Sequence, residues 1–250
     1  MHILVIDGNY VETELRAKFG PGHKYSFISF DVLPLTPGDQ SFDERREAVW
    51  EALHLAAKTA DVIFCFQENG FTDWNVSVGA GIPMFVEVSS ARSLGALHSQ
   101  YDNYATFYSQ DIKLLFGFCG LPTLLNRPLL EVSLYDEADR AKLAATCAAL
   151  GTDYRVVADR VGLVTPRVVC QIINEACFTV QEGTASMADV DLAMQLGTNY
   201  PRGPFAWANA IGVERVYAVL EALWNDTHDE RYKVCPLLKR QALRGEPFAV

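Results

Sequence analysis

The stretch "DERREAVWEALHLAAKTADVIFCF" (residues 43–66) decides the fold of the first half of the chain. In its first part, Val49, Leu53 and Ala56 or Ala57 recur at helical spacing, with charged residues on the other side. The run "DVIFCF" (61–66) then has the length and apolar character of a buried strand. Similar runs lie at 2–7, 25–34 and 83–89. Strands that alternate with helices in this way predict a parallel sheet with crossover helices.

From about residue 160 onward the sequence predicts helices without strands. The segment "PRVVCQIINEACFTVQEG" is a long apolar helix that ends at Gly183. The segment "SMADVDLAMQLG" begins with Ser186 and Asp189 at capping-box spacing and ends at Gly197. The segment "VERVYAVLEALW" (213–224) places its apolar residues on one stripe. We therefore predict an α/β domain over residues 1–158 and an all-α domain over residues 159–250.

Composition and charge limit the classes of partner. The 250 residues are half hydrophobic, enough for a sizeable core, and carry a net charge of −10 without any run of lysine or arginine. This charge argues against a nucleic acid or an anionic membrane as the main partner. Six cysteines are scattered without a C-x-x-C pair, no group suggests a metal site, and we find no signal peptide or membrane span. We expect reduced thiols and a cytoplasmic protein.

The second half of the chain resembles the C-terminal domain of the 3-hydroxyacyl-CoA dehydrogenase family. The matching motifs follow one another in order: "NEAC" (174–177), "EGTAS" (182–186), "DVDLAMQLGTNYPRGP" (189–204), "IGVERV" (211–216) and "ERYKVCPLLKR" (230–240). The resemblance implies a helical domain that forms a homodimer in relatives and closes one side of a substrate cleft. It also implies a Rossmann-like first domain and NAD as the cofactor.

The first half resembles the same family more loosely. The segment "TADVIFCFQEN" (59–69) is similar to the family's fourth strand, with Glu68 and Asn69 at its acidic-Asn pair. The segment "EVSSARSL" (87–94) is similar to one that supplies a serine to the substrate hydroxyl, which implies this role for Ser89 or Ser90. The segment "RPLLEV" (127–132) is similar to the strand whose glutamate, here Glu131, orients the catalytic histidine.

Two positions that carry the family's chemistry differ in this chain. A histidine suits the removal of a hydroxyl proton near neutral pH. Counted back from Glu131 without a gap, the family's catalytic histidine falls on Cys119, and no histidine lies between His98 and His228. The family's substrate-binding asparagine falls on Pro166, which has no side-chain donor. The next residue, Arg167, is expected to have a structural partner.

The first turn of the chain, "VIDGNYVETEL" (5–15), departs from the dinucleotide fingerprint. The places of its three glycines hold Asp7, Asn9 and Glu12, and Gly8 lies between the first two. Carboxylates at the start of a helix oppose a pyrophosphate that the helix would otherwise attract. This turn predicts weak NAD binding or none. Asp31 stands at the end of the second strand, where an acid could hold the ribose hydroxyls.

Three hypotheses of function remain open. The first is a 3-hydroxyacyl-CoA dehydrogenase homologue without dehydrogenase activity, which binds an acyl-CoA or a small carboxylate or accompanies an active enzyme. The second is an NAD-dependent oxidoreductase of fatty acid metabolism that uses altered residues, with His98 as the substitute base. The third is a dimeric interaction module, whose surfaces would be the stripe from Val213 to Trp224 and the turn from Tyr200 to Phe205; a place for the stripe in the core is the alternative.

Overall fold

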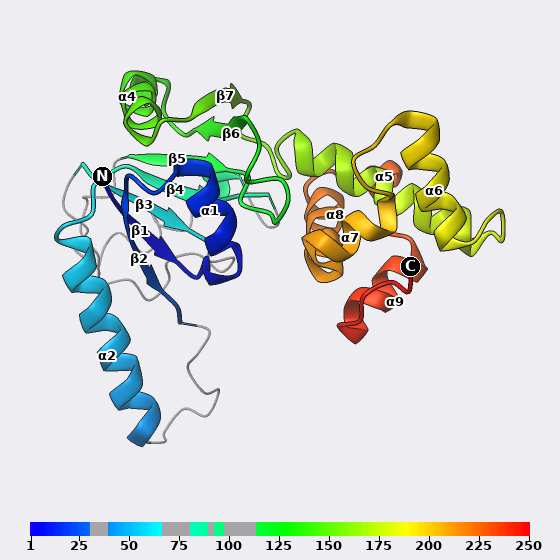
Figure 1. The fold of residues 1–250 in the computed structure, drawn as a ribbon, viewed down its shortest axis with the longest axis horizontal. Helices are drawn as coiled ribbons and strands as arrows, with labels where there is room; N and C mark the ends of the chain where they lie inside the picture. The colour runs from blue at the N-terminus through cyan, green and yellow to red at the C-terminus, as the bar shows by residue number, and fades with distance from the viewer. Residues whose placement is uncertain (31–39, 67–80, 90–92, 98–113) are drawn as a thin grey trace. The chain divides into compact units, whose positions relative to one another are not determined.

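A computed structural model describes residues 1–30, 40–66, 81–89, 93–97 and 114–250, with the side chains of 40–43 excepted. The chain forms two compact units. The first consists of Met1–Glu87, Ser93–Gly120 and Leu125–Asp159, and the second of Val88–Arg92, Leu121–Leu124 and Arg160–Val250. Figure 1 shows strands in the first unit and helices in the second. The predicted fold class, an α/β Rossmann-like domain followed by an all-α domain, is confirmed.

The first unit is built on a seven-stranded sheet in the order β2-β1-β3-β4-β5-β6-β7. The strands span His2–Ile6 (β1), Lys24–Ile28 (β2), Val62–Cys65 (β3), Met84–Glu87 (β4), Leu115–Phe118 (β5), Leu129–Leu134 (β6) and Asp153–Val157 (β7). All neighbouring strands are parallel except β5 and β6, which pair in opposite directions. The predicted parallel sheet is therefore confirmed for the other neighbouring strands, and the antiparallel pairing of β5 and β6 was not predicted.

Burial explains the texture of the strands. The central strands β1, β3, β4 and β5 are buried at every residue, because a parallel sheet is covered on both faces. Phe64, Phe85 and Phe116 lie side by side on β3, β4 and β5, and the rings of Phe64 and Phe85 stack with centroids 4.8 Å apart. This aromatic row forms the middle of the core of the first unit.

The helices of the first unit are α1 (Glu12–Phe19), α2 (Gln40–Ala57) and α4 (Arg140–Leu150), with a helical turn at 94–97. Short 3-10 turns at Asn9–Val11 and Glu137–Asp139 precede α1 and α4. Leu15 and Phe19 of α1 belong to the same buried cluster as Leu143 and Leu150 of α4. These two helices therefore cover the same face of the sheet, as Figure 1 also shows.

The second unit consists of helices α5 to α9. They span Thr165–Gln181 (α5), Met187–Thr198 (α6), Pro204–Ile211 (α7), Val213–Thr227 (α8) and Pro236–Arg244 (α9), with a 3-10 turn at Glu230–Tyr232. The helix expected to end at Gly197 continues to Thr198 and ends at Asn199, which adopts a left-handed φ of 56°. Asparagine tolerates this conformation and can therefore replace glycine at a helix end.

The apolar stripe of α8 forms the core of the second unit. Val216, Leu220 and Leu223 are fully buried, and so is Phe205 of α7. Thr123, from one of the short segments of this unit, accepts a hydrogen bond of 3.0 Å from Trp207 Nε1. For these buried residues, the hypothesis that the stripe and the turn before α7 form a partner surface was wrong. Their side chains pack inside the unit.

Candidate functional site

The carboxyl ends of β1, β3, β4 and β5 lie along one edge of the sheet, because these strands are mutually parallel. In open α/β sheets this edge is where ligands bind. Asp7, Phe66, Glu87 and Gly120 all lie at or just beyond these strand ends. The candidate site is therefore built at this edge.

Cys119 and Glu131 are neighbours across the antiparallel pair of strands. The Cys119 N–H donates to the Glu131 carbonyl oxygen at 3.3 Å. The thiol residue is buried, whereas Glu131 is half-buried. The structure thus places Cys119, at the predicted base position, next to Glu131, the predicted orienting glutamate.

The predicted serine segment is described only in part. Ser89 follows β4 and is fully buried, and Ser90 lies outside the described residues. Glu87, at the end of β4, is also buried, and its Oε1 accepts a hydrogen bond of 3.4 Å from Gly120 N. Glu87 was not predicted as a site residue. The signal in the sequence was an acid that ends an apolar run next to a serine segment.

Pro166 and Arg167 lie in the first turn of α5 and serve its start. Pro166 is buried in a position where its missing N–H leaves no helical bond unmade. Arg167 donates through Nη2 to the Val161 carbonyl at 2.7 Å, through Nε to the Leu163 carbonyl at 3.3 Å, and through Nη1 to the Tyr232 hydroxyl. The expected structural partners of Arg167 are confirmed, and they account for all three of its nitrogens.

Several motif residues of the second unit tie its helices together. Asn174 of α5 donates to the Lys233 carbonyl at 3.0 Å and accepts from Cys235 N at 2.8 Å. Asp191 of α6 accepts from Phe205 N at 2.7 Å and from Ala206 N at 2.9 Å. These bonds satisfy backbone groups at the starts of other segments, which buried polar groups require.

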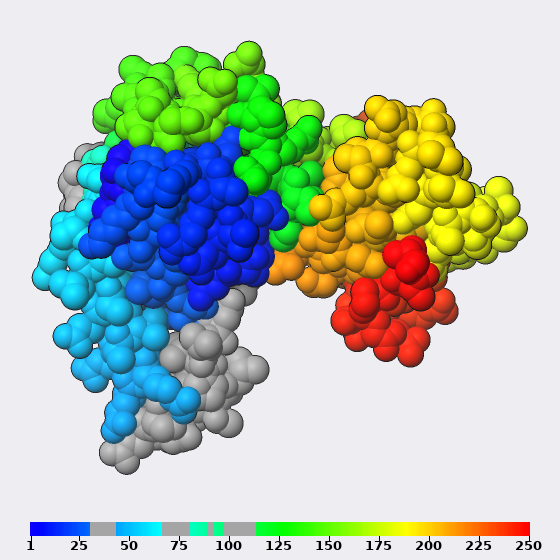
Figure 2. All heavy atoms as spheres, in the orientation of Figure 1, coloured from blue at the N-terminus to red at the C-terminus, as the bar shows by residue number. Residues whose placement is uncertain are grey.

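An apolar groove of about 880 Å³ crosses the second unit. Val168 and Ile172 of α5 and Val190 and Met194 of α6 line it, together with Tyr232, other uncharged residues and four charged ones. Among its apolar side chains Val168 is exposed, at 53%. In Figure 2 the yellow atoms of α6 lie on the surface of this unit. Exposed apolar patches of this kind mark interaction sites more often than chance.

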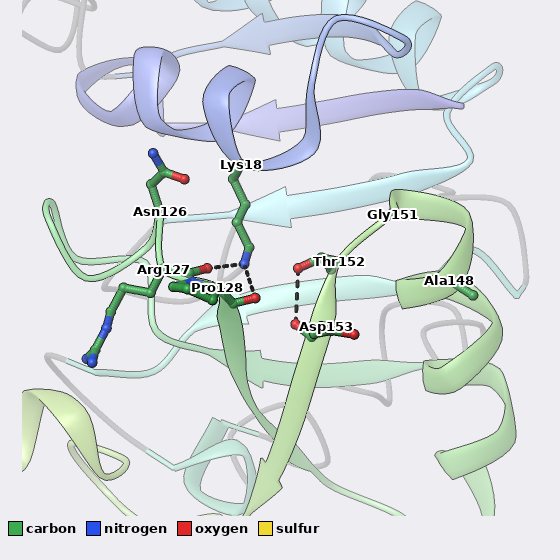
Figure 3. A pocket seen from close by; sticks show the side chains of 8 residues that line it. All are labelled: Lys18, Asn126, Arg127, Pro128, Ala148, Gly151, Thr152 and Asp153. Carbon is green, nitrogen blue, oxygen red and sulfur yellow. Dashed lines mark hydrogen bonds between the residues drawn. The ribbon is translucent and has the colours of Figure 1, made fainter.

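A second pocket, of about 570 Å³, lies at the amino ends of β6 and β7 in the first unit. Figure 3 shows Lys18 reaching across it to the chain at Arg127 and Pro128. Its ammonium donates to both of these carbonyls, at 3.3 Å in the case of Pro128. Burial lowers the pKa of Lys18, and the nearby Asp153 carboxylate opposes this effect. Lys18 thus links α1 to the residues that directly precede β6.

All six cysteines are free and buried, as expected. Burial raises the pKa of Cys147 to about 12 and also raises that of Cys177. These two thiols therefore stay protonated near neutral pH and are unsuited to nucleophilic chemistry. In the part of the chain that the structure describes, no helix is both long and apolar enough to cross a membrane.

Comparison with known proteins decides the family. Residues 162–247 match the sequence profile of the 3-hydroxyacyl-CoA dehydrogenase C-terminal domain. The chain is 46% identical over 87 residues to 3-hydroxyadipyl-CoA dehydrogenase of Escherichia coli (strain K12), a match that covers 35% of this chain and 18% of that protein. Residues 162–247 therefore belong to the C-terminal domain of the 3-hydroxyacyl-CoA dehydrogenase family. The assignment rests on this part of the chain, which carries the profile match.

Other relatives extend the match. The chain is 33% identical over 134 residues to 3-hydroxybutyryl-CoA dehydrogenase of Bradyrhizobium diazoefficiens, covering 51% of this chain and 46% of the relative. Across these curated relatives the matched stretch spans less than half of each protein. The crystal structure of (S)-3-hydroxybutyryl-CoA dehydrogenase PaaH1 from Ralstonia eutropha aligns over 98% of this chain and 94% of its own, with a TM-score of 0.64 and 20% identity. That likeness shows the shared fold.

The family suggests NAD as a cofactor, so the first turn of this dehydrogenase-like protein was compared with what a dinucleotide needs. A dinucleotide needs glycines beside its phosphates and the bare N-terminus of a helix. Here a 3-10 turn, Asn9–Val11, precedes α1, whose first turn carries Glu12 and Glu14. Glu12 pairs with Arg16 at 2.8 Å within the helix. Asp31 lies outside the described residues. The described residues of this turn do not fit the cofactor.

Proposed function

We propose that the protein is a dimeric member of the 3-hydroxyacyl-CoA dehydrogenase family that binds an acyl-CoA or a small carboxylate and does not oxidise or reduce it with NAD. The observation that carries this proposal is Cys119, which is buried and hydrogen-bonded along the backbone to Glu131. A dehydrogenase base must exchange a proton with a hydroxyl near neutral pH. A buried cysteine in an apolar strand end does not supply that exchange.

The test of turnover is an assay of the purified protein with acetoacetyl-CoA and NADH, run beside an active relative from Escherichia coli. The expected result is no NADH oxidation above the background without protein. Ser89→Ala and Glu131→Gln are the matched variants. Turnover in the wild-type chain that both variants abolish would show that the altered residues still perform catalysis, and the non-catalytic part of the proposal would be wrong.

The test of binding is thermal unfolding with acetoacetyl-CoA, free CoA or acetoacetate, each in excess. A ligand that binds the folded state alone raises the unfolding temperature, by an amount that grows with the logarithm of the ratio of its concentration to its Kd. We expect acetoacetyl-CoA or acetoacetate to raise it. If none of the three shifts the transition, the ligand part of the proposal fails, and the interaction module becomes the better hypothesis.

The groove between α5 and α6 supports a second copy of the chain as the partner. Its lining carries both acidic and basic side chains, Glu175 and Asp189 with Arg167 and Arg231. In a two-fold interface the same patch of both copies is in contact: where residue i of one copy contacts residue j of the other, residue j of the first copy contacts residue i of the second. A patch with both signs of charge can therefore pair with itself. Leu192 and Leu196 of α6 are also exposed, although they do not line the groove.

The dimer is tested by sedimentation of the wild-type chain and of Val168→Glu. A buried interface does not tolerate an unpaired charge, so the variant is expected to sediment as a monomer where the wild-type chain is a dimer. Leu55→Glu is the matched control, because Leu55 is also exposed, at 68% against 53% for Val168, but lies on α2 in the first unit. A wild-type monomer at micromolar concentration, or a Val168→Glu dimer, would contradict the proposal.

A further inference from the structure

Asp7, not Gly8, takes the left-handed backbone conformation in the first turn. Asp7 has a φ of 52°, which glycine adopts most readily. Gly8 has a φ of −105° and a ψ of 20°, which any residue can adopt. The turn therefore does not need a glycine at position 8 for its backbone. Some other requirement must explain why Gly8 has no side chain.

That requirement is the ring of Phe66. A Cβ atom on Gly8 would lie 2.5 Å from Cδ2 of Phe66, 2.6 Å from Cε2 and 2.6 Å from Cγ1 of Val5. A Cβ atom on Gly120 would lie 2.6 Å from Cε1, on the other side of the same ring, and 2.7 Å from Cγ of Glu87. Real Cβ atoms do not approach other atoms this closely. The ring of Phe66 is thus seated between two glycines, one after β1 and one after β5.

Aromatic contacts hold the ring in this seat. Phe66 meets Phe118 edge to face, with centroids 5.3 Å apart, and meets Tyr10 in the same way at 5.8 Å. Such pairs are favourable beyond the apolar area that they bury. Phe66 is only 5% exposed. The ring is therefore part of the packed edge of the sheet.

Asp7 closes the turn on its other side. Its Oδ1 accepts a hydrogen bond of 2.6 Å from Phe30 N and one of 3.2 Å from the Ser29 hydroxyl. Ser29 and Phe30 directly follow β2. The carboxylate thus joins the ends of β1 and β2, and it is 6% exposed. These bonds offset the conformational cost of a non-glycine residue with a positive φ.

We propose that Phe66 and Asp7 take the space and the hydrogen bonds that a dinucleotide would need at the ends of β1 and β2, and that Gly8 serves the ring and not a phosphate. In a dinucleotide turn the glycine lets the backbone approach the pyrophosphate. In this chain the ring lies against Gly8 instead, and a buried carboxylate stands where a second anion would be repelled. The region where relatives of this fold bind a dinucleotide here holds the ends of β1 and β2 together.

The test is a double-mutant cycle on Gly8 and Phe66, read by thermal unfolding. Gly8→Ala is expected to lower the unfolding temperature by about 2–10 °C, because an added methyl group in a packed site causes strain. Phe66→Val removes the ring atoms that the methyl group would meet and leaves only the contact with Val5 Cγ1. In the Phe66→Val background, Gly8→Ala is therefore expected to cause a smaller loss than in the wild-type chain. Gly22→Ala is the control, since nothing lies within 4 Å of a Cβ there and its φ is not positive.

Either a Gly8→Ala variant as stable as Gly22→Ala, or an equal loss with and without the ring, would overturn the proposal. If Gly8→Ala alone does not fold, folding of the double variant supports it and failure of the double variant beside a folded Phe66→Val overturns it. Calorimetry of the wild-type chain with NADH up to about 1 mM is expected to show no saturable binding. Saturable binding would also overturn this proposal. It would not decide whether the protein lacks turnover, which the acetoacetyl-CoA assay tests separately.

Discussion

Asp191 offers a quantitative test of how the helical unit is held together. Its two carboxylate oxygens accept hydrogen bonds of 2.7 and 2.9 Å from the first turn of α7, and the residue is buried. Each hydrogen bond to a charged group contributes about 1.5–3 kcal/mol. The carboxylate also faces the positive end of the α7 dipole. Asp191→Ala leaves both donors without acceptors, so we expect a loss of about 3–5 kcal/mol in the free energy of unfolding.

Asp191→Asn tests the two oxygens separately. Its amide keeps one acceptor oxygen for one of the two N–H groups and presents an NH₂ donor to the other. It should therefore lose about half as much as Asp191→Ala. At roughly 2–4 °C per kcal/mol, the expected fall in unfolding temperature is about 6–20 °C for alanine. Trp207 lies within α7, so its fluorescence reports on the helix that loses its cap.

Asp226→Asn is the matched control in the same unit. Asp226 pairs with Arg160 at 3.2 Å on the surface, and such a pair contributes about 0–1 kcal/mol. Its unfolding temperature is expected to fall by a few degrees at most. If Asp191→Ala and Asp226→Asn unfold at the same temperature, Asp191 does not stabilise the start of α7 and the reasoning fails.

Three further predictions concern other groups. Asn174→Ala leaves Cys235 N without its acceptor, so denaturant unfolding should show a loss of about 1–3 kcal/mol. Burial raises the pKa of Cys147 to about 12, so iodoacetamide at pH 8 should label Cys147 only in denaturant; rapid labelling of the native chain would contradict this. Burial in the folded state lowers the pKa of Lys18 below its ordinary value of 10.5. As the pH rises toward 10.5, the unfolded chain therefore binds more protons than the folded chain. The stability of the wild-type chain relative to Lys18→Met should therefore rise between pH 8 and pH 10, and a fall would refute the sign.

The architecture could be predicted from the sequence where burial leaves a simple signal. Strands buried on both faces become continuous apolar runs, which is why residues 2–7 and 61–66 were found correctly. The antiparallel pairing of β5 and β6 was missed, because an apolar run does not record strand direction. The short, helix-free connection between Phe118 and Leu129 was the available signal, since parallel neighbours need a longer crossover.

The site could be predicted only where it depends on nearby residues in the sequence. The loss of a dinucleotide turn was visible from the missing glycines between Asp7 and Glu12. The reason for Gly8 was not visible, because Phe66 reaches it from a strand that lies far along the chain. Position in the sequence predicts that Cys119 stands at the place of the catalytic histidine of relatives, but its pairing with Glu131 depends on strand register.

The helical unit is not one continuous piece of chain, and this limits how it can be exchanged. It includes Leu121–Leu124 as well as Arg160–Val250, and Thr123 binds the indole of Trp207. A chimera that takes only residues 160–250 into a relative would leave behind the hydroxyl that this indole uses. Recombination of the two halves at a single crossover point would thus disturb the helical unit even where every helix is retained.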